Sequence, residues 1–342
     1  MLVRFFGFAV SAAYWPGILS AAYTPRWAVI AVGLPFVPGF RLGGPMLWLL
    51  GWLVVLGAMS LRLSPDQLTG FFELICIVLL CGTFIFGAAL PSLDDLMIGL
   101  GVGLAISSCL TVMQALGWDG LPQSAAPAGL FYNREVLAEF AALVMVWAML
   151  RPRWVIAFAA FVPVVLCYSR IAILTVLLGL LYAWCGRSKL RWTVSGCGLL
   201  ILAAGSLFAM GFGKAASADH RLILWGATIL AFEPFGHGLG WFQAAHPVEE
   251  FAHSDVLQAI VELGYGAVAL VIIPIAAFWR KRGSVAERAL FAAACFQMVV
   301  SFPLHMPAQG FLVAAVAGYL ACGGAVVRLG QHLGTSDDVA RA

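Results

Sequence analysis

The residues with the clearest chemical potential lie within positions 217–266, where polar side chains interrupt a sequence that is otherwise mostly apolar. The spacing of Arg221, Trp225 and Thr228 places them on one face of a helix whose other faces are apolar. Such a helix is expected to lie in the membrane interface. Arg221 can there bind an anionic group or, as the alternative, extend toward lipid headgroups.

A second group of polar residues begins at His253. Asp255, Gln258 and Glu262 follow it and fall within about 60° of one another on a helix. They form a polar stripe that enters an apolar segment, and ionisable groups inside membrane spans usually line a cavity or a pathway. The alternative is structural pairing of these carboxylates with an arginine from another segment.

Two earlier segments supply such arginines. Asn133 is a plausible N-cap for the helix that begins with Arg134, and Arg170 joins two short apolar runs with no real loop between them. Two or three converging arginines, Arg221 among them, suit a diphosphate, because the guanidinium group binds phosphate in a bidentate manner. A neutral histidine nearby, here His253, can serve as a general base.

Two other patterns predict no chemistry. The Gly-rich residues 236–240 lack the spacing and the preceding strand of a dinucleotide site, so they predict a tight turn, with anion binding by backbone N–H groups as the alternative. His246 and His253 do not form an H-E-x-x-H motif, and Pro247 interrupts any helix through His246. We therefore expect no metal site and no cofactor.

Composition defines the elements that must position these residues. The chain has 342 residues, of which 63% are hydrophobic and only 10% are charged, against about a quarter charged in soluble domains. Apolar runs long enough to span a bilayer recur along the whole length, without the alternation of barrel strands. The sequence predicts an all-α, polytopic integral membrane protein with about twelve transmembrane helices.

The expected spans lie near residues 5–23, 27–38, 45–60, 68–90, 96–116, 135–150, 154–168, 171–185, 193–212, 254–279, 289–306 and 309–327. The second is short and Pro-rich and is expected to be tilted or broken. Residues 1–328 form a single transmembrane domain with a larger periplasmic loop, residues 213–253, that contains the short interfacial helix. Residues 329–342 are expected to be a disordered cytoplasmic tail.

The distribution of basic residues predicts the orientation. With a cytoplasmic N-terminus, thirteen of the 19 Lys and Arg residues fall on the cytoplasmic side, so both termini are expected there. Arg134, Arg170 and Arg221 belong to the smaller, external set, and each stands beside other polar groups. Arginines retained on the disfavoured side indicate a functional site that faces outward.

Taken in order, these segments resemble the O-antigen ligase and O-antigen polymerase superfamily of bacterial membrane glycosyltransferases. That family carries an R…W…P-x-G-x-G-x-x-x-F segment and then H-N-x-x-L-x-x-x-x-E-x-G. The matching residues here are Arg221, Trp225, Pro234, Gly236, Gly238, Phe242, His253, Leu257, Glu262 and Gly264. The segments SRIAILTVLLGLL and GLFYNREVLAEF resemble two further motifs of the family. Ser254 and Glu135 depart from it, since the family has Asn at both positions.

The resemblance implies metal-independent transfer of a glycan from a polyprenyl (undecaprenyl) diphosphate to an acceptor hydroxyl at the periplasmic face of the bacterial inner membrane. Carried over by position, Arg170 and Arg221 hold the diphosphate, and His253 deprotonates or orients the acceptor. Asn133 and Arg134 belong to the substrate-binding set, as do Gln258 and Glu262, which would position the catalytic groups.

Several alternatives stay open. The acceptor can be lipid A–core, a growing polysaccharide or a protein hydroxyl. A lipid-linked saccharide flippase or a secondary transporter would use the polar stripe as a translocation path, and would place polar groups near the middle of several spans. A metal-dependent intramembrane hydrolase would depend on His246 and His253 alone. None of these readings involves nucleic acid.

Overall fold

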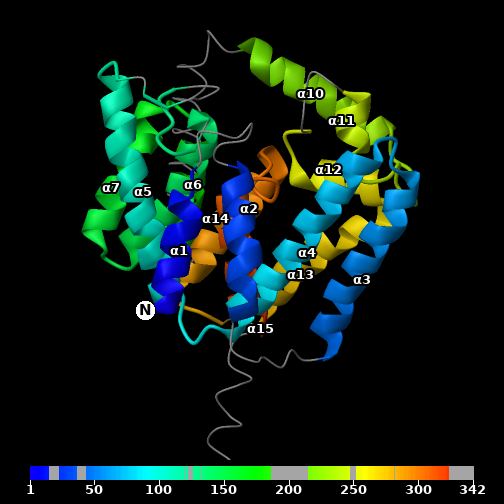
Figure 1. The fold of residues 1–342 in the computed structure, drawn as a ribbon, viewed down its shortest axis with the longest axis horizontal. Coiled ribbons are helices and arrows are strands. Elements are labelled where there is room, and N and C mark those ends of the chain that lie inside the picture. The colour runs from blue at the N-terminus through cyan, green and yellow to red at the C-terminus, as the bar shows by residue number, and fades with distance from the viewer. Residues whose placement is uncertain are drawn as a thin grey trace, which may run out of the picture.

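The computed structural model describes residues 1–14, 23–36, 44–118, 120–121, 126–131, 133–185, 215–246, 252–280 and 282–322. These residues form helices and no β-strand, as the composition predicts. Figure 1 shows the longer helices side by side in a bundle, with α10 (Ala215–Leu230) and α11 (Trp241–Ala245) across its upper end.

The remaining α-helices are α1 (Leu2–Ala12), α2 (Tyr23–Gly33), α3 (Gly44–Ser60), α4 (Gln67–Ala89), α5 (Asp94–Ala115), α6 (Arg134–Leu150), α7 (Trp154–Leu166), α8 (Arg170–Cys185), α12 (Asp255–Leu263), α13 (Ala269–Trp279), α14 (Val285–Val300) and α15 (Pro307–Cys322). In the described part of the chain, short 3₁₀ segments follow α2, α3 and α12, and are η1 (Leu34–Phe36), η2 (Leu61–Leu63) and η3 (Gly264–Val268).

Four helical segments in the described part of the chain are long and apolar enough to cross a membrane. They are Met46–Leu63, Gln67–Ala89, Asp94–Ala115 and Asp255–Trp279. Shorter apolar helices of 10–17 residues, such as α1, α7, α8 and α15, accompany them. The chain is thus an all-helical protein with the character of a membrane protein, and the expected number of about twelve spans stays a prediction. The expected span 193–212 and the tail 329–342 lie outside the described residues.

Two expected spans are interrupted. The segment 254–279 changes from α12 to the 3₁₀ turn η3 at Gly264, whose φ of 56° and close approach to the Pro234 carbonyl suit only glycine. The segment expected at 289–306 leaves the helix after Val300, and Pro303 follows within the non-helical residues 301–306. Both interruptions bring backbone groups to the upper end of the bundle, where the predicted site residues lie.

The centre of the bundle is α15, which is buried along almost its whole length and packs against α4, α13 and α14. Small residues allow α4 and α15 to approach closely. A Cβ atom on Gly318 would overlap the Phe84 carbonyl, and one on Gly87 would overlap the Ala315 carbonyl. Such backbone-to-backbone contact is how helices associate in a lipid environment, where no hydrophobic force drives them together.

This packing gives a testable result. Gly318→Ala is expected to destabilise the protein by about 1–3 kcal/mol, because the added methyl group forces α4 and α15 apart. Gly51→Ala in α3 is the matched control, since a Cβ atom there meets nothing within 4 Å. The measurement is the thermal unfolding midpoint of the purified protein in detergent. Equal midpoints for the two variants would contradict the close contact.

Ion pairs fix which helix ends meet at the lower end of the bundle. Arg4 of α1 contacts Asp95 of α5 at 2.8 Å, and Arg151, just after α6, contacts Glu287 of α14 at 2.7 Å. Because the end of α6 meets the start of α14, the start of α6 must lie near the end of α14. The chain returns through α7, so α8 also begins at that upper end.

The Arg151–Glu287 pair has a predictable pH dependence. Glu287 lies in the first turn of α14, before the apolar run. Burial raises the pKa of Glu287, but the Ser284 hydroxyl and the Arg151 guanidinium outweigh it and hold that pKa below its ordinary value. A carboxyl whose pKa is lower in the folded state stabilises the protein above its unfolded pKa, and this stabilisation is lost as the pH falls through the folded pKa.

Glu287→Gln is therefore expected to lower the unfolding midpoint near pH 7, and the difference from the wild type should shrink as the pH is lowered. Asp95→Asn is the control, because the Arg4–Asp95 pair is half-exposed and exposed pairs contribute little. A difference between Glu287→Gln and wild type that stays constant down to about pH 3 would contradict the assigned ion pair.

Candidate functional site

The candidate site is built around residues 301–306, the junction between α14 and α15. Its backbone is held by Asp255, the first residue of α12. The Asp255 N–H donates to the Ser301 carbonyl at 3.0 Å, and the Leu304 N–H donates to Asp255 Oδ2 at 2.8 Å. The start of α12 and the junction are thus one rigid unit, because each satisfies backbone groups of the other.

Arg221 of α10 contacts this unit from above. Its Nη1 donates to the carbonyl of Val300, the last residue of α14, at 3.4 Å. One turn further along the same face of α10, Trp225 Nε1 donates to the Ala252 carbonyl at 2.9 Å. The residues predicted to share a face of α10 therefore do so, and that face meets the segment that carries His253.

His253 lies between Ala252 and the N-cap of α12. Its φ of 54° is unusual for a non-glycine residue, and such strained backbone is often found at functional sites. Its ring packs against Phe302 of the junction, with 5.3 Å between ring centroids. Ser254 caps α12 by accepting a hydrogen bond from the Leu257 N–H at 3.3 Å, which is the usual role of a serine at this position.

Asn133 and Arg134 stand at the start of α6, at the same upper end of the bundle. The Asn133 side chain accepts a hydrogen bond from the Glu135 N–H at 2.8 Å, which confirms the predicted N-cap. Arg134 is half-buried there, and Arg170 is half-buried at the start of α8. The helix directions thus place Arg134 and Arg170 at the end where Arg221 contacts α14, and the convergence of the three arginines stays a prediction.

The loop before Asn133 is itself held by an arginine. Arg26 of α2 is buried and donates through Nη2 to the Ser11 carbonyl at 2.9 Å and to the Leu130 carbonyl at 3.0 Å. Its guanidinium carbon lies 3.9 Å from the centre of the Phe131 ring. Arg26 therefore has a structural role, because it ties α1 and α2 to the segment that leads into α6.

Gln258 and Glu262 lie with Asp255 on the buried face of α12. Gln258 Oε1 accepts from the Ala252 N–H and its Nε2 donates to Glu262 Oε1, both at 3.3 Å. Glu262 Oε1 also accepts from the Phe242 N–H at 3.2 Å. These contacts connect α12 to α11 and to the residue before His253, and the positioning role stays a prediction. Direct contact of either side chain with substrate stays a prediction.

The Gly-rich residues 236–240 form the predicted tight turn. Gly236, Gly238 and Gly240 have φ values of 70°, 99° and 77°. The N–H groups of His237 and Gly238 donate to carbonyls at the end of α12, at 2.8 and 3.2 Å. Because these donors are already used within the protein, they are not available to bind an anion.

Two polar residues of the site were not singled out from the sequence. His305 of the junction binds Asp255 Oδ1 through Nδ1 at 2.7 Å, and its Nε2 lies 3.6 Å from Glu73 Oε2 of α4. Glu73 is an ionisable residue inside a long apolar run, a signal that could have identified it. His305 carries no comparable signal, because the break between α14 and α15 was expected only after residue 306.

Glu139, one turn into α6, connects the arginine-bearing helices to the junction. Its buried carboxylate accepts a hydrogen bond from Ser301 Oγ at 2.7 Å and attracts Arg221 electrostatically. Gln297 of α14 donates to the Glu139 carbonyl at 3.0 Å and to Thr175 of α8 at 3.1 Å. Segments far apart in sequence, α6, α8, α10, α12 and α14, are thus joined around residues 301–306.

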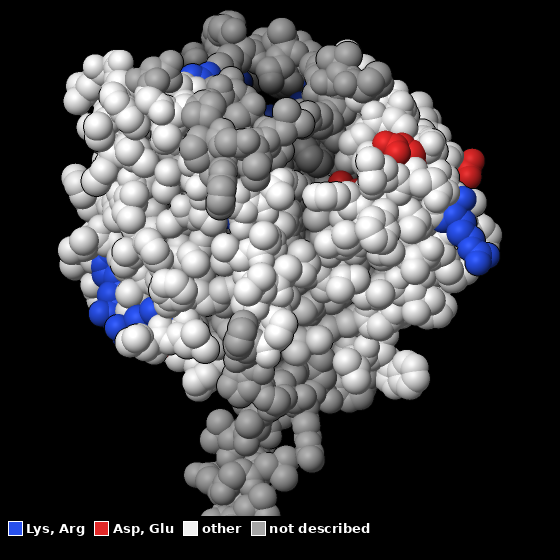
Figure 2. All heavy atoms as spheres, in the orientation of Figure 1, with Lys and Arg blue, Asp and Glu red and all other residues white. Residues whose placement is uncertain are grey.

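Figure 2 shows the distribution of charge on one face of the molecule. Most of this face carries neither basic nor acidic side chains. Within the described ranges, no group of three or more His, Cys, Asp or Glu residues is placed to hold a metal ion. Comparison with protein-family models and with curated protein sequences finds no match.

Proposed function

We propose that the chain is a membrane glycosyltransferase of the O-antigen ligase type, which transfers a glycan from a polyprenyl diphosphate to an acceptor hydroxyl. The observation that carries the proposal is the meeting of Arg221 and His253 at one junction. Arg221 binds the carbonyl of Val300, and His253 packs against Phe302, two residues further along the chain. Both residues also belong to the motifs that resemble the ligase and polymerase superfamily.

The chemistry follows from what the groups can do. In the transfer, the acceptor oxygen forms a bond to the anomeric carbon while the bond from that carbon to the diphosphate breaks. Negative charge develops on the departing diphosphate, and fixed guanidinium groups such as Arg221 and Arg170 stabilise it. His253 takes the proton from the acceptor hydroxyl. We propose no metal ion or other cofactor for this reaction.

Helix positions support the proposed location. Arg4 and Arg151 lie at the lower end of the bundle, opposite the end that carries Arg221 and His253. Cytoplasmic loops of membrane proteins carry the excess of basic residues. We therefore propose that the lower end faces the cytoplasm of a bacterium, that both termini lie there, and that the site opens to the periplasm.

The test is reconstitution of the full chain in liposomes with a polyprenyl-diphosphate oligosaccharide and candidate acceptors: lipid A–core, polysaccharide and a hydroxyl-bearing peptide. The proposal predicts a new glycosidic bond to one of these acceptors, detected by mass spectrometry, and its formation in the presence of a chelator. A flippase or transporter would move the lipid-linked saccharide across the bilayer and form no new bond. Movement without transfer would reject the glycosyltransferase.

A further inference from the structure

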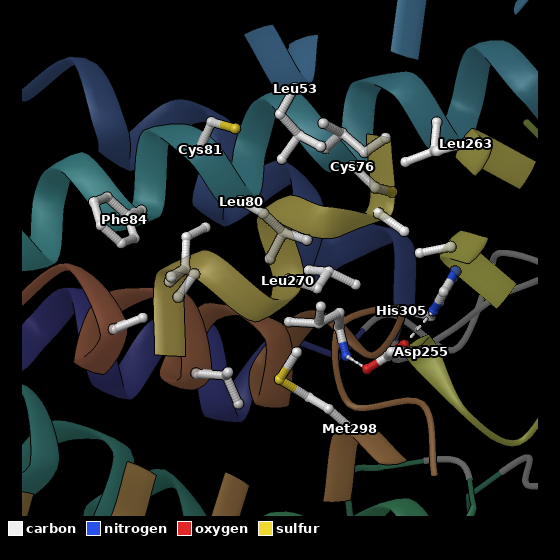
Figure 3. A pocket seen from close by; sticks show the side chains of 18 of the residues that line it. Leu53, Cys76, Leu80, Cys81, Phe84, Asp255, Leu263, Leu270, Met298 and His305 are labelled. Carbon is white, nitrogen blue, oxygen red and sulfur yellow. Dashed lines mark hydrogen bonds and ion pairs between the residues drawn. The ribbon is translucent and has the colours of Figure 1, made fainter. Parts of the chain in front are cut away.

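A cavity of about 140 Å³ lies between α3, α4, α12, α13 and α15, and we refer to it as the slot. Figure 3 shows that its labelled side chains are apolar or sulfur-bearing, except at one end, where Asp255 and His305 are joined. Leu53, Leu270 and Ile273 line the slot and are themselves only half-buried, so it reaches toward the outer surface of the bundle.

The polar end of the slot is strongly acidic. Three carboxylates line it, those of Glu73, Asp255 and Glu262, and the one basic group among the lining residues is His305. A protonated His305 can balance one ionised carboxylate, and burial disfavours ionisation of the other two unless a further cation binds. An anionic diphosphate is repelled here, so the polar end of the slot differs in chemistry from the arginine-bearing face above it.

One acceptor atom at this end has no partner among the described residues. Glu262 is 3% exposed, and both of its hydrogen bonds, from Phe242 N–H and from Gln258 Nε2, go to Oε1. Its second oxygen, Oε2, receives no hydrogen bond from the described residues, although Glu262 lines the slot. A carboxylate oxygen beside a cavity can accept a hydrogen bond from a donor bound there.

We propose that the slot binds an amphiphile with a protonated amine head, which donates hydrogen bonds to Glu262 and Glu73 while its alkyl chain lies along α4, α13 and α15. Charge complementarity selects an ammonium group, because it supplies both the positive charge and the hydrogen-bond donors that this end lacks. A cavity of about 150 Å³ holds one benzene ring. The slot thus holds the head and the first methylene groups, and the rest of the chain extends toward the lipid.

The experiment uses the full chain in nanodiscs of phosphatidylcholine, which contain no primary amine. Three photoreactive probes share one twelve-carbon chain with a diazirine and differ only in the head: a primary amine, a hydroxyl or a phosphate. After irradiation, cross-linked peptides are located by mass spectrometry, and unlabelled dodecylamine is added as competitor. The amine probe should label peptides of α4, α13 or α15 in a saturable way, and the phosphate and hydroxyl probes should do so at least about tenfold more weakly.

Glu262→Gln and Glu73→Gln test the head contact, because each keeps the shape and removes the negative charge. Each is expected to weaken amine labelling about tenfold or more. Glu233→Gln is the control, since the Glu233 side chain is 61% exposed and does not line the slot. Size-exclusion chromatography establishes folding, and Glu73→Gln decides the matter if Glu262→Gln does not fold.

Equal labelling by the amine, hydroxyl and phosphate probes would overturn the proposal, and so would unchanged amine labelling in folded carboxylate variants. Labelling by the hydroxyl probe as strong as that by the amine would overturn it as well. These outcomes do not depend on glycan transfer, because no donor or acceptor is present in the experiment. Failure of the amine site and failure of the proposed glycosyltransferase are thus separate results.

Discussion

Arg221→Ala is expected to lower the rate of glycan transfer by about 10²–10³-fold while the protein still folds. That is the usual effect of removing one fixed donor that stabilises charge in a transition state. In the folded protein the guanidinium is held in place by the Val300 carbonyl at 3.4 Å, and it contributes no packing to the centre of the bundle. The loss should therefore appear in catalysis and not in stability.

The measurement is the single-turnover rate of reconstituted protein at saturating donor. Arg62→Ala is the matched control, because Arg62 is an exposed arginine of η2, outside the candidate site. Arg221→Lys should recover only part of the rate, since an ammonium group keeps the charge but not the planar fork that binds phosphate oxygens in pairs. Full activity of Arg221→Ala would remove Arg221 from the site.

His253→Ala is expected to reduce transfer by about 10²–10⁴-fold, the usual contribution of a general base. The wild-type rate should fall on acidification, because a protonated imidazole cannot accept the acceptor proton, and the residual rate of the variant should lose that dependence. If His253 only packed against Phe302, its replacement by alanine would leave the pH dependence of the transfer rate unchanged.

His246→Ala provides the control for this prediction. His246 follows α11, and its ring lies 4.7 Å from the Phe242 ring, away from the junction. Its removal should leave the transfer rate within a few-fold of wild type. If His246→Ala and His253→Ala reduced the rate equally, and zinc restored the activity of chelator-treated protein, a metal-dependent hydrolase would replace the proposed glycosyltransferase.

Local signals in the sequence predicted the parts of the fold that local forces determine. Apolar composition identified the helices, because a bilayer requires every backbone group to be paired within its own segment. Asn133 was recognised as a helix cap because a capping side chain bonds to the next turn. The face shared by Arg221 and Trp225 follows from helix periodicity alone.

Contacts between distant segments could not be predicted in this way. Glu73, Asp255 and His305 come from α4, α12 and the junction after α14, and no periodicity in the sequence connects them. The junction itself was missed because residues 289–306 are apolar enough to be read as one continuous span. Pro303 was the available signal, since proline disfavours the helical conformation in the residue before it.

The contacts of Arg170 could not be predicted from local sequence signals either. Its motif predicts a role beside Arg221, and its place at the upper end follows from the directions of α6, α7 and α8. Half-buried at the start of α8, Arg170 can turn toward the candidate site or toward headgroups without any change of helix packing. Transfer rates of Arg170 variants, and not the helix packing, therefore decide whether Arg170 acts in the site.

The most direct test of the central claim is single-turnover transfer from a radiolabelled polyprenyl-diphosphate oligosaccharide, with wild type, Arg221→Ala, His253→Ala and Arg62→Ala compared at equal amounts of folded protein. We predict that wild type and Arg62→Ala form labelled glycoconjugate at similar rates, and that each of the other two variants loses at least about 10²-fold. Product formation at the wild-type rate by both Arg221→Ala and His253→Ala would contradict the proposed site.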